Sequence, residues 1–190
     1  MNIKAADNLA PIRDQIDNLV SSNSRVIELG CGNGDLLFKL APKIKTGLGI
    51  DKSQLLITSA MKRKEQYNLQ NIDFMQKEIG EDYLPPGTWD ISIASLFFHV
   101  VPPSDAIFIL DKFKEVSNEI IICGFCRPES FSQSILLWLD QRFSMHFKNF
   151  VSYKKHGYME GILAEARCSS ILTHNTYLPF LKIYQINCAQ

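Results

Sequence analysis

Short apolar segments alternate with amphipathic segments along the first two thirds of the chain. The apolar segments predict five strands, at Arg25–Leu29, Thr46–Ile50, Asn71–Gln76, Trp89–Ala94 and Glu119–Phe125. Between them, apolar residues recur with the period of a helix. This period predicts helices at Ala6–Leu19, Asp35–Ala41, Ser53–Gln66 and Ser104–Val116, with Ser53 as the N-cap of the third. Such alternation predicts a doubly wound α/β fold, with a parallel sheet covered by helices on both faces.

The last third of the chain departs from this alternation. Residues Ser130–Phe150 form a long amphipathic stretch rich in Phe, Trp and Met, and a further helix is predicted at His156–Ala166. Two strands, Ser169–Thr173 and Leu178–Asn187, follow with no helix between them. We therefore expect an antiparallel hairpin at one edge of the sheet.

Length and charge restrict the class of protein. The chain has 190 residues, of which 46% are hydrophobic, and this predicts a single domain, 1–190, with a substantial core. Lys and Arg together number 20, as do Asp and Glu, so the formal charge is zero. Without a basic surplus, binding of nucleic acid by bulk electrostatics is not expected.

No targeting or membrane signal is recognisable. Charges are scattered through the first twenty residues, and the longest apolar runs fall short of the ~20 residues that span a bilayer. The five cysteines are an odd number at this length, which indicates reduced thiols. Cys123 and Cys126 have C-x-x-C spacing, but a zinc site needs two further ligands, so we expect no metal. These features predict a cytoplasmic protein that does not enter membranes.

A glycine-rich turn is the strongest chemical signal. Gly30, Gly32 and Gly34 follow the first predicted strand and precede a helix, so a ligand can approach bare backbone N–H groups there. Asp51 ends the neighbouring strand. In doubly wound sheets, ligands bind outside the carboxyl ends of the strands. A carboxylate at that place suits the two hydroxyls of a ribose.

The charges around this turn favour a cationic ligand. A dinucleotide-binding fingerprint has its third glycine where this chain has Asp35, and Glu28 adds a second carboxylate just before the turn. Both carboxylates disfavour a pyrophosphate. S-adenosylmethionine carries a sulfonium and an α-amino group and has no phosphate.

Several motifs together resemble class I S-adenosylmethionine-dependent methyltransferases. The segments are VIELGCGNG at 26–34, GLGIDKS at 47–53, DFMQKE at 73–78 and WDISIASLFFH at 89–99. The terminal hairpin also matches, so the resemblance extends from Arg25 to Asn187. It implies a Rossmann-like, doubly wound, seven-stranded and mostly parallel sheet with a C-terminal antiparallel hairpin. It also implies S-adenosyl-L-methionine as the cofactor.

The resemblance also implies the cofactor-binding residues. They are Glu28, Gly30, Cys31, Gly32, Gly34, Asp51, Lys52, Glu78, Ile79, Ala94 and Ser95. By this resemblance, the glycines line the methionine and ribose parts of the cofactor, and Asp51 binds the ribose hydroxyls. Glu78 and Ile79 contact the adenine. Residues 94 and 95 lie beside the methionine part. The third motif usually offers Asp, whereas this chain has the longer variant Lys77-Glu78.

The sequence says less about the residues that would bind the methyl acceptor. His99 is the candidate catalytic residue, because its ordinary pKa suits a general base, but it could equally be packed among its aromatic neighbours. Aromatic residues within 128–158 predict either a helical lid-like insertion or ordinary core. The first 22 residues are predicted to form an N-terminal helical segment.

The sequence thus predicts methyl transfer to an O, N or C atom of a small-molecule acceptor by a monomer or homodimer. The family's Asn/Asp-Pro-Pro-aromatic tetrad, which supports transfer to the amino groups of bases and of glutamine, is replaced here by Ala94-Ser95-Leu96-Phe97. The alternatives are a methyltransferase-fold partner subunit, a non-methylating enzyme and, less favoured, a nicotinamide-dependent oxidoreductase.

Overall fold

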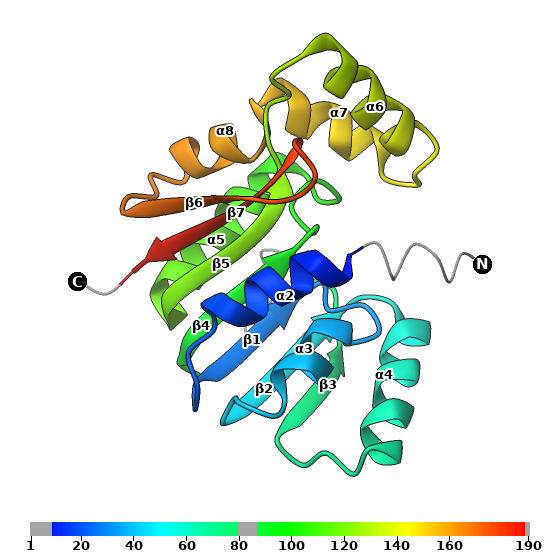
Figure 1. The fold of residues 1–190 in the computed structure, drawn as a ribbon, viewed down its shortest axis with the longest axis vertical. Coiled ribbons are helices and arrows are strands. Elements are labelled where there is room, and N and C mark those ends of the chain that lie inside the picture. The colour runs from blue at the N-terminus through cyan, green and yellow to red at the C-terminus, as the bar shows by residue number, and fades with distance from the viewer. Residues whose placement is uncertain (1–8, 80–86, 189–190) are drawn as a thin grey trace.

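A computed structural model describes residues 9–79 and 87–188, and these residues contain one sheet with the strand order β3-β2-β1-β4-β5-β7-β6 (Figure 1). The strands are β1 (Arg25–Leu29), β2 (Thr46–Asp51), β3 (Ile72–Gln76), β4 (Trp89–Ser95), β5 (Ser117–Phe125), β6 (Ile171–Asn175) and β7 (Leu181–Asn187). Strands β1 to β5 pair in parallel, whereas β7 pairs antiparallel with both β5 and β6. The predicted fold class, including the terminal hairpin, is confirmed.

The helices occur in the predicted order along the chain. They are α2 (Ala10–Leu19), α3 (Asp35–Leu40), α4 (Gln54–Gln66), α5 (Pro103–Val116), α6 (Phe131–Arg142), α7 (Phe147–Lys155) and α8 (Tyr158–Glu165). The Ser53 side chain accepts a hydrogen bond from the backbone N–H of Leu56, as expected of an N-cap. Residues 1–8 of the predicted N-terminal helical segment lie outside the described residues.

Some boundaries differ from the predicted ones. The amphipathic stretch 130–150 is divided between α6 and α7, with a connection at 143–146. The last strand begins at Leu181 rather than Leu178, because the Thr176 hydroxyl donates to the carbonyls of Leu178 and Leu181 and so stabilises a turn. Strand β5 begins at Ser117, two residues before the predicted start.

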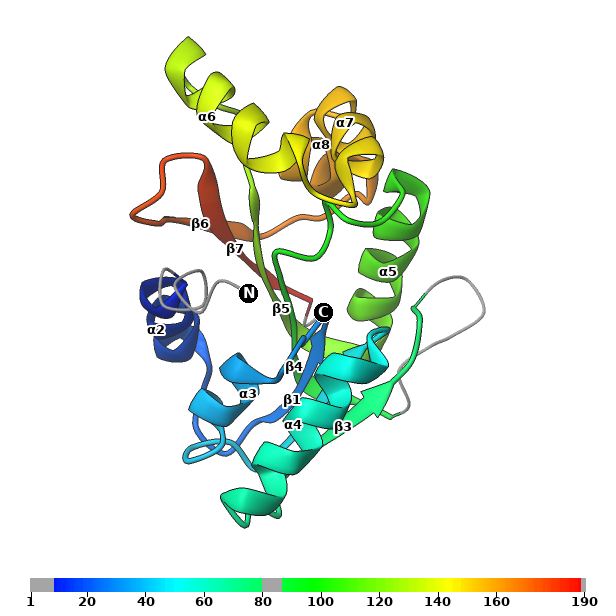
Figure 2. The same ribbon diagram turned by 90° about the vertical axis from the view of Figure 1, so that its right-hand side faces the viewer.

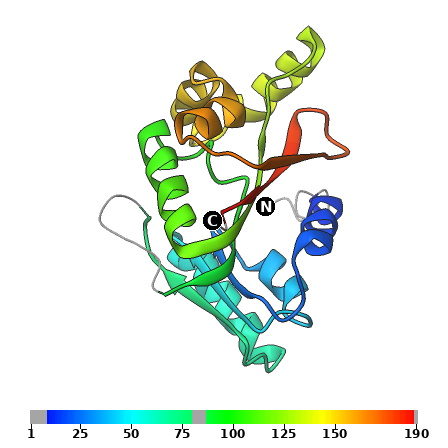
Figure 3. The same cartoon turned by 90° about the vertical axis from the view of Figure 1, so that its left-hand side faces the viewer.

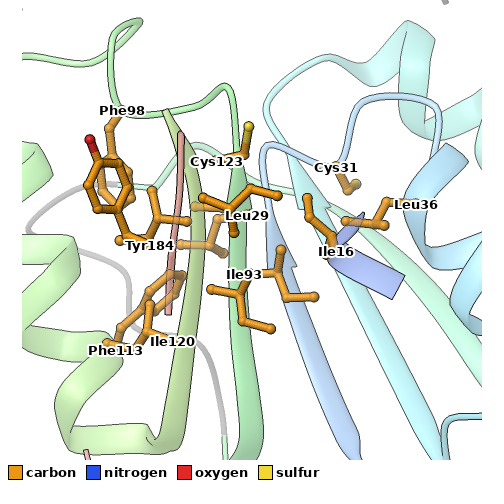
Figure 4. Packing of buried hydrophobic residues seen from close by; sticks show 14 of the residues in the cluster. Ile16, Leu29, Cys31, Leu36, Ile93, Phe98, Phe113, Ile120, Cys123 and Tyr184 are labelled. Atoms are coloured by element: carbon orange, nitrogen blue, oxygen red, sulfur yellow. The ribbon is translucent and has the colours of Figure 1, made fainter. Parts of the chain in front are cut away.

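The core lies on both faces of the sheet. Helices α2 and α3 lie together on one face and α5 covers the other (Figures 2 and 3). Leu29 of β1, Ile93 of β4 and Ile120 of β5 are fully buried, and Figure 4 shows them within the cluster that also includes Ile16 of α2. Strands buried on both faces explain the nearly continuous apolar sequences from which they were predicted.

The strand order also fixes where a ligand can bind. The chain leaves β1 toward β2 on one side and returns to β4 on the other, so the order reverses between β1 and β4. Such a reversal opens a crevice at the carboxyl ends of the strands, and ligands of doubly wound proteins bind there. Within the described residues, no helix has the length and apolar composition that crossing a membrane requires.

Candidate cofactor-binding site

The turn between β1 and α3 requires glycine at two positions. Gly30 and Gly34 have φ angles of 71° and 81°, in the left-handed region that glycine tolerates best. A Cβ atom on Gly30 would lie 2.6 Å from Cδ2 of Phe97, and one on Gly34 would lie 2.5 Å from Cε1 of Phe74. The backbone of the turn is therefore closely packed against aromatic side chains as well as conformationally restricted.

Asp51 at the end of β2 holds this turn in place. Its Oδ2 atom accepts a hydrogen bond of 2.9 Å from the N–H of Gly32, and its Oδ1 atom accepts one of 2.8 Å from the N–H of Ser53. Each carboxylate oxygen has two lone pairs, so both oxygens keep capacity to accept a further hydrogen bond. The side chain can therefore shape the turn and bind a pair of hydroxyls together.

Arg63 of α4 forms an ion pair with Asp35, one of the carboxylates next to the glycine turn. Its Nη1 atom lies 2.6 Å from Oδ1 of Asp35 and donates to the carbonyl of Asn33 at 3.1 Å, while the guanidinium stacks over Phe38. The sequence predicted that Asp35 disfavours a pyrophosphate. The structure adds a partner for this carboxylate, and the ion pair offsets part of its charge.

Glu28 remains as the unusual carboxyl group of the site. It is fully buried in β1, and burial, reinforced by the charges of Asp35 and Asp51, raises its pKa to about 8. Its Oε2 atom has no hydrogen-bond partner among the described residues. A cationic ligand near the glycine turn would favour the ionised form of this group. The carboxyl groups of Glu28, Asp35 and Asp51 around the turn therefore fit a cofactor that bears a sulfonium or an ammonium group, as the sequence predicted.

A cavity of about 450 Å³ lies at the carboxyl ends of the strands, a size typical of small-molecule sites. Five predicted cofactor residues line it: Gly30, Asp51, Lys52, Glu78 and Ile79. The other six lie outside its wall: Glu28, Cys31, Gly32, Gly34, Ala94 and Ser95. Of these six, Glu28, Cys31, Gly34 and Ala94 are buried around the turn and the strands below it.

Apart from Ser53, which the family resemblance places with Lys52 near the adenine, the rest of the wall was not predicted from the sequence as a site. It consists of Ile50, Ser53, Leu56, Lys77, Leu96, Phe97, Val100, Val101, Met145 and His146. Most of these side chains are apolar, so this part of the cavity suits a hydrophobic group. Met145 and His146 come from the connection between α6 and α7, within the segment predicted as a lid. Their signal in the sequence was the aromatic composition of that segment, which does not single out either residue.

His99 lies behind this wall rather than in it. The ring is buried, with its centroid 4.7 Å from that of Phe125 and 6.4 Å from that of Tyr153, both in edge-on arrangements. Burial, with a smaller contribution from the charge of His146, lowers the pKa of His99 to about 4. The imidazole is therefore neutral at neutral pH. Its catalytic role stays a prediction, and its surroundings match the packed alternative.

Comparison with known proteins identifies the family. A family model described as a methyltransferase domain matches residues 20–168. Together with the sheet order and the glycine turn, this defines a class I S-adenosylmethionine-dependent methyltransferase domain. The chain belongs to the methyltransferase domain family, and the predicted class and cofactor are confirmed.

Individual relatives are distant. The 23S rRNA (uracil(1939)-C(5))-methyltransferase RlmD of Haemophilus influenzae is 25% identical over 129 residues, which cover 67% of this chain and 29% of that protein. The chain thus spans about a third of the length of the curated relatives it matches.

Solved structures share the fold at low identity. The magnesium protoporphyrin IX methyltransferase of Synechocystis PCC 6803 with bound SAH has a TM-score of 0.66 at 17% identity, covering 98% of this chain and 88% of its own. The N-methyltransferase NodS of Bradyrhizobium japonicum WM9 also has a TM-score of 0.66, at 11% identity, with both chains covered completely. These likenesses support the architecture.

Proposed function

We propose that the protein transfers the methyl group of S-adenosylmethionine to an O, N or C atom of a small-molecule acceptor. The observation that carries the proposal is one cavity lined both by Gly30 and Asp51 and by Met145 and His146. A cofactor and an acceptor in one cavity can meet without intervening water. The family assignment supports the reaction class.

In this proposal the described residues hold the cofactor at several points. Asp51 accepts hydrogen bonds from the ribose hydroxyls through its remaining lone pairs, and Glu78 and Ile79 contact the adenine. Gly30 brings bare backbone to the methionine part, and the cationic groups of the cofactor favour ionisation of Glu28, which then attracts them. When bound, the cofactor supplies an electrophilic methyl group attached to a sulfonium.

The acceptor would lie against the apolar part of the wall. Leu96, Phe97, Val100 and Val101 follow β4 and exclude water from the reacting atoms. In a direct displacement, alignment and exclusion of water supply much of the acceleration. A base is needed only if the acceptor keeps its proton. His99 stays our predicted base, and His146 is the second candidate because it lines the cavity.

Two observations favour a small molecule over RNA, although one relative is named as an rRNA methyltransferase. The formal charge of the chain is zero, so it offers no overall attraction to a polyanion. The residues at 94–97 also lack the tetrad associated with transfer to the amino groups of bases. RNA remains a competing outcome in the activity test.

Calorimetric titration tests the cofactor site first. S-adenosylmethionine and S-adenosylhomocysteine should bind the wild type with micromolar affinity, and NAD should not. Asp51→Ala should weaken both adenosyl ligands about tenfold or more, since charge-assisted hydrogen bonds are lost. Asp73→Ala, which removes an exposed carboxylate from β3, should leave binding unchanged. Binding of NAD in place of the adenosyl ligands would instead support an oxidoreductase.

An acceptor screen then tests the substrate class. Formation of S-adenosylhomocysteine is measured with panels of phenols, carboxylic acids and amines, and in parallel with structured and single-stranded RNA. Turnover with a small molecule supports the proposal. Turnover with RNA alone contradicts it, and cofactor binding that leads to turnover only when another protein is added would favour the partner-subunit alternative.

A further inference from the structure

Helix α6 presents an unusually apolar surface to solvent. Ile135, Leu136, Trp138 and Leu139 are exposed along it, and Phe131 at its first turn is 81% exposed. Among its apolar side chains, Leu137 is the one buried against the rest of the protein. Figure 2 shows α6 projecting away from the sheet. Exposed apolar side chains concentrated on one helix are typical of a binding surface.

This surface continues to the cofactor cavity. Phe143 follows the last turn of α6 and is 84% exposed, and Met145, two residues further, is 95% exposed while it also lines the cavity. With a rise of about 1.5 Å per residue, the helix supplies a path of roughly 18 Å that ends at the cavity mouth. We call the exposed side chains of residues 131, 135, 136, 138, 139, 143 and 145 the α6 strip.

A cation lies at the end of the strip nearest the cavity. The Arg142 guanidinium is 4.6 Å from the centroid of the Trp138 ring and 6.0 Å from that of Phe143. Arg142 is exposed and forms no ion pair within residues 9–79 and 87–188. A guanidinium held on aromatic rings is well suited to bind a carboxylate or another anionic group.

We infer that the methyl acceptor is a free, water-dispersed amphiphile, with an apolar body that lies on the α6 strip and an anionic group that binds Arg142. The atom to be methylated then reaches the cavity beyond Met145 and His146. This inference rests on the proposed function and names the substrate class of the same site. It explains why an apolar surface, a cation and the reaction cavity adjoin one another.

Two other occupants fit the charges less well. A second copy packed through the same strip would bring two Arg142 side chains to one apolar interface without a carboxylate from the strip. A membrane-surface helix usually carries Lys and Arg on its polar side. On α6 the polar residues beside the strip are Gln133 and Asp140 instead, and Gln141 is buried against the protein.

Fluorescence titration tests the inference directly. Trp89 and Trp138 are the two tryptophans, so Trp89→Phe leaves Trp138 as a single reporter on the strip. In this background, dodecanoate below its micellar concentration should give a saturable change in emission. Dodecanol and dodecyltrimethylammonium, which match the chain but not the charge, should bind about tenfold more weakly.

Matched variants separate the strip from the rest of the surface. Arg142→Gln should weaken dodecanoate about tenfold and leave dodecanol unchanged, whereas Leu139→Ser should weaken both. Lys62→Gln on α4 and Leu172→Ser on β6 remove an exposed charge and an exposed apolar side chain elsewhere, and should change neither. All four variants should bind S-adenosylhomocysteine as the wild type does.

The remaining outcomes overturn the inference. If S-adenosylhomocysteine binds but dodecanoate does not, the substrate class is wrong while the proposed cofactor site stands. If S-adenosylhomocysteine itself does not bind, the proposed function fails first. Sedimentation showing a dimer that Leu139→Ser dissociates would assign the strip to a second copy. Binding to anionic vesicles without binding to dispersed dodecanoate would assign it to a membrane surface.

Discussion

The Asp51 carboxylate is joined to the backbone of Gly32 by a hydrogen bond of 2.9 Å, across 19 residues of sequence. Its other oxygen accepts from the N–H of Ser53, so one side chain ties the glycine turn to the start of α4. The site is therefore largely formed before a ligand arrives. Asp51, which the sequence predicted to bind the ribose, therefore also stabilises the conformation of the turn.

This dual role gives the first prediction. Asp51→Asn can keep one of the two backbone hydrogen bonds, but its amide nitrogen cannot accept the other. We expect the free energy of unfolding to fall by about 1–3 kcal/mol, the cost of an unsatisfied backbone N–H, together with weaker binding of S-adenosylhomocysteine. Urea denaturation and calorimetry measure the two effects. Asp73→Asn is the control, and an unchanged stability of Asp51→Asn would contradict the stabilising role.

The second prediction concerns Gly30. Gly30→Ala introduces both a strained φ angle and a clash with Phe97, whereas Gly87→Ala, at φ 84°, introduces the strain with only an ordinary contact of 3.9 Å between the new Cβ and Nη2 of Arg25. We expect each to lose about 1–2 kcal/mol of stability from strain, and Gly30→Ala to lose more and to bind the cofactor weakly. Thermal denaturation and calorimetry check this. Phe97→Ala combined with Gly30→Ala should recover part of the additional stability loss, and no recovery would exclude the clash as its cause.

Glu28 should make the stability of the ligand-free protein depend on pH. Its pKa is about 8 in the folded state, against 4.5 for the ordinary group. Between these values the folded state binds a proton that the unfolded state has released, so stability falls as pH rises, by at most about 1.4 kcal/mol per pH unit. Glu28→Gln cannot titrate, and its free energy of unfolding should vary less between pH 5 and 8. Parallel pH dependences in the two proteins would contradict the raised pKa.

The two histidines can be separated kinetically once an acceptor is known. Because the pKa of His99 is lowered to about 4, its imidazole stays neutral from pH 8 down to about 5. If His99 is the base, kcat/KM should show no loss from its protonation over that range, and His99→Gln should lower kcat about a hundredfold or more. A comparable loss of kcat in His146→Gln, with His99→Gln close to the wild type, would assign the base to His146 instead.

Most of the fold followed from local patterns in the sequence. The apolar strands, the glycines at 30, 32 and 34, and the acidic residue at the end of β2 are each recognisable within about ten residues. The terminal hairpin followed from two consecutive strands with no helix between them, and the number of strands came from the family resemblance, whereas the strand order is known from the structure. The sequence also identified Gly30, Asp51, Lys52, Glu78 and Ile79, which do line the cavity.

Only the tertiary structure decided which distant side chains meet. The pairing of Arg63 with Asp35, the burial of His99 beside Phe125 and the entry of His146 into the cavity wall each join separate elements. The sequence by itself determined the strands and the glycine turn, because periodicity and backbone conformation are properties of neighbouring residues. Charge pairing and solvent exclusion depend on how whole helices pack, so the electrostatics of the site and its acceptor side became visible only in the folded protein.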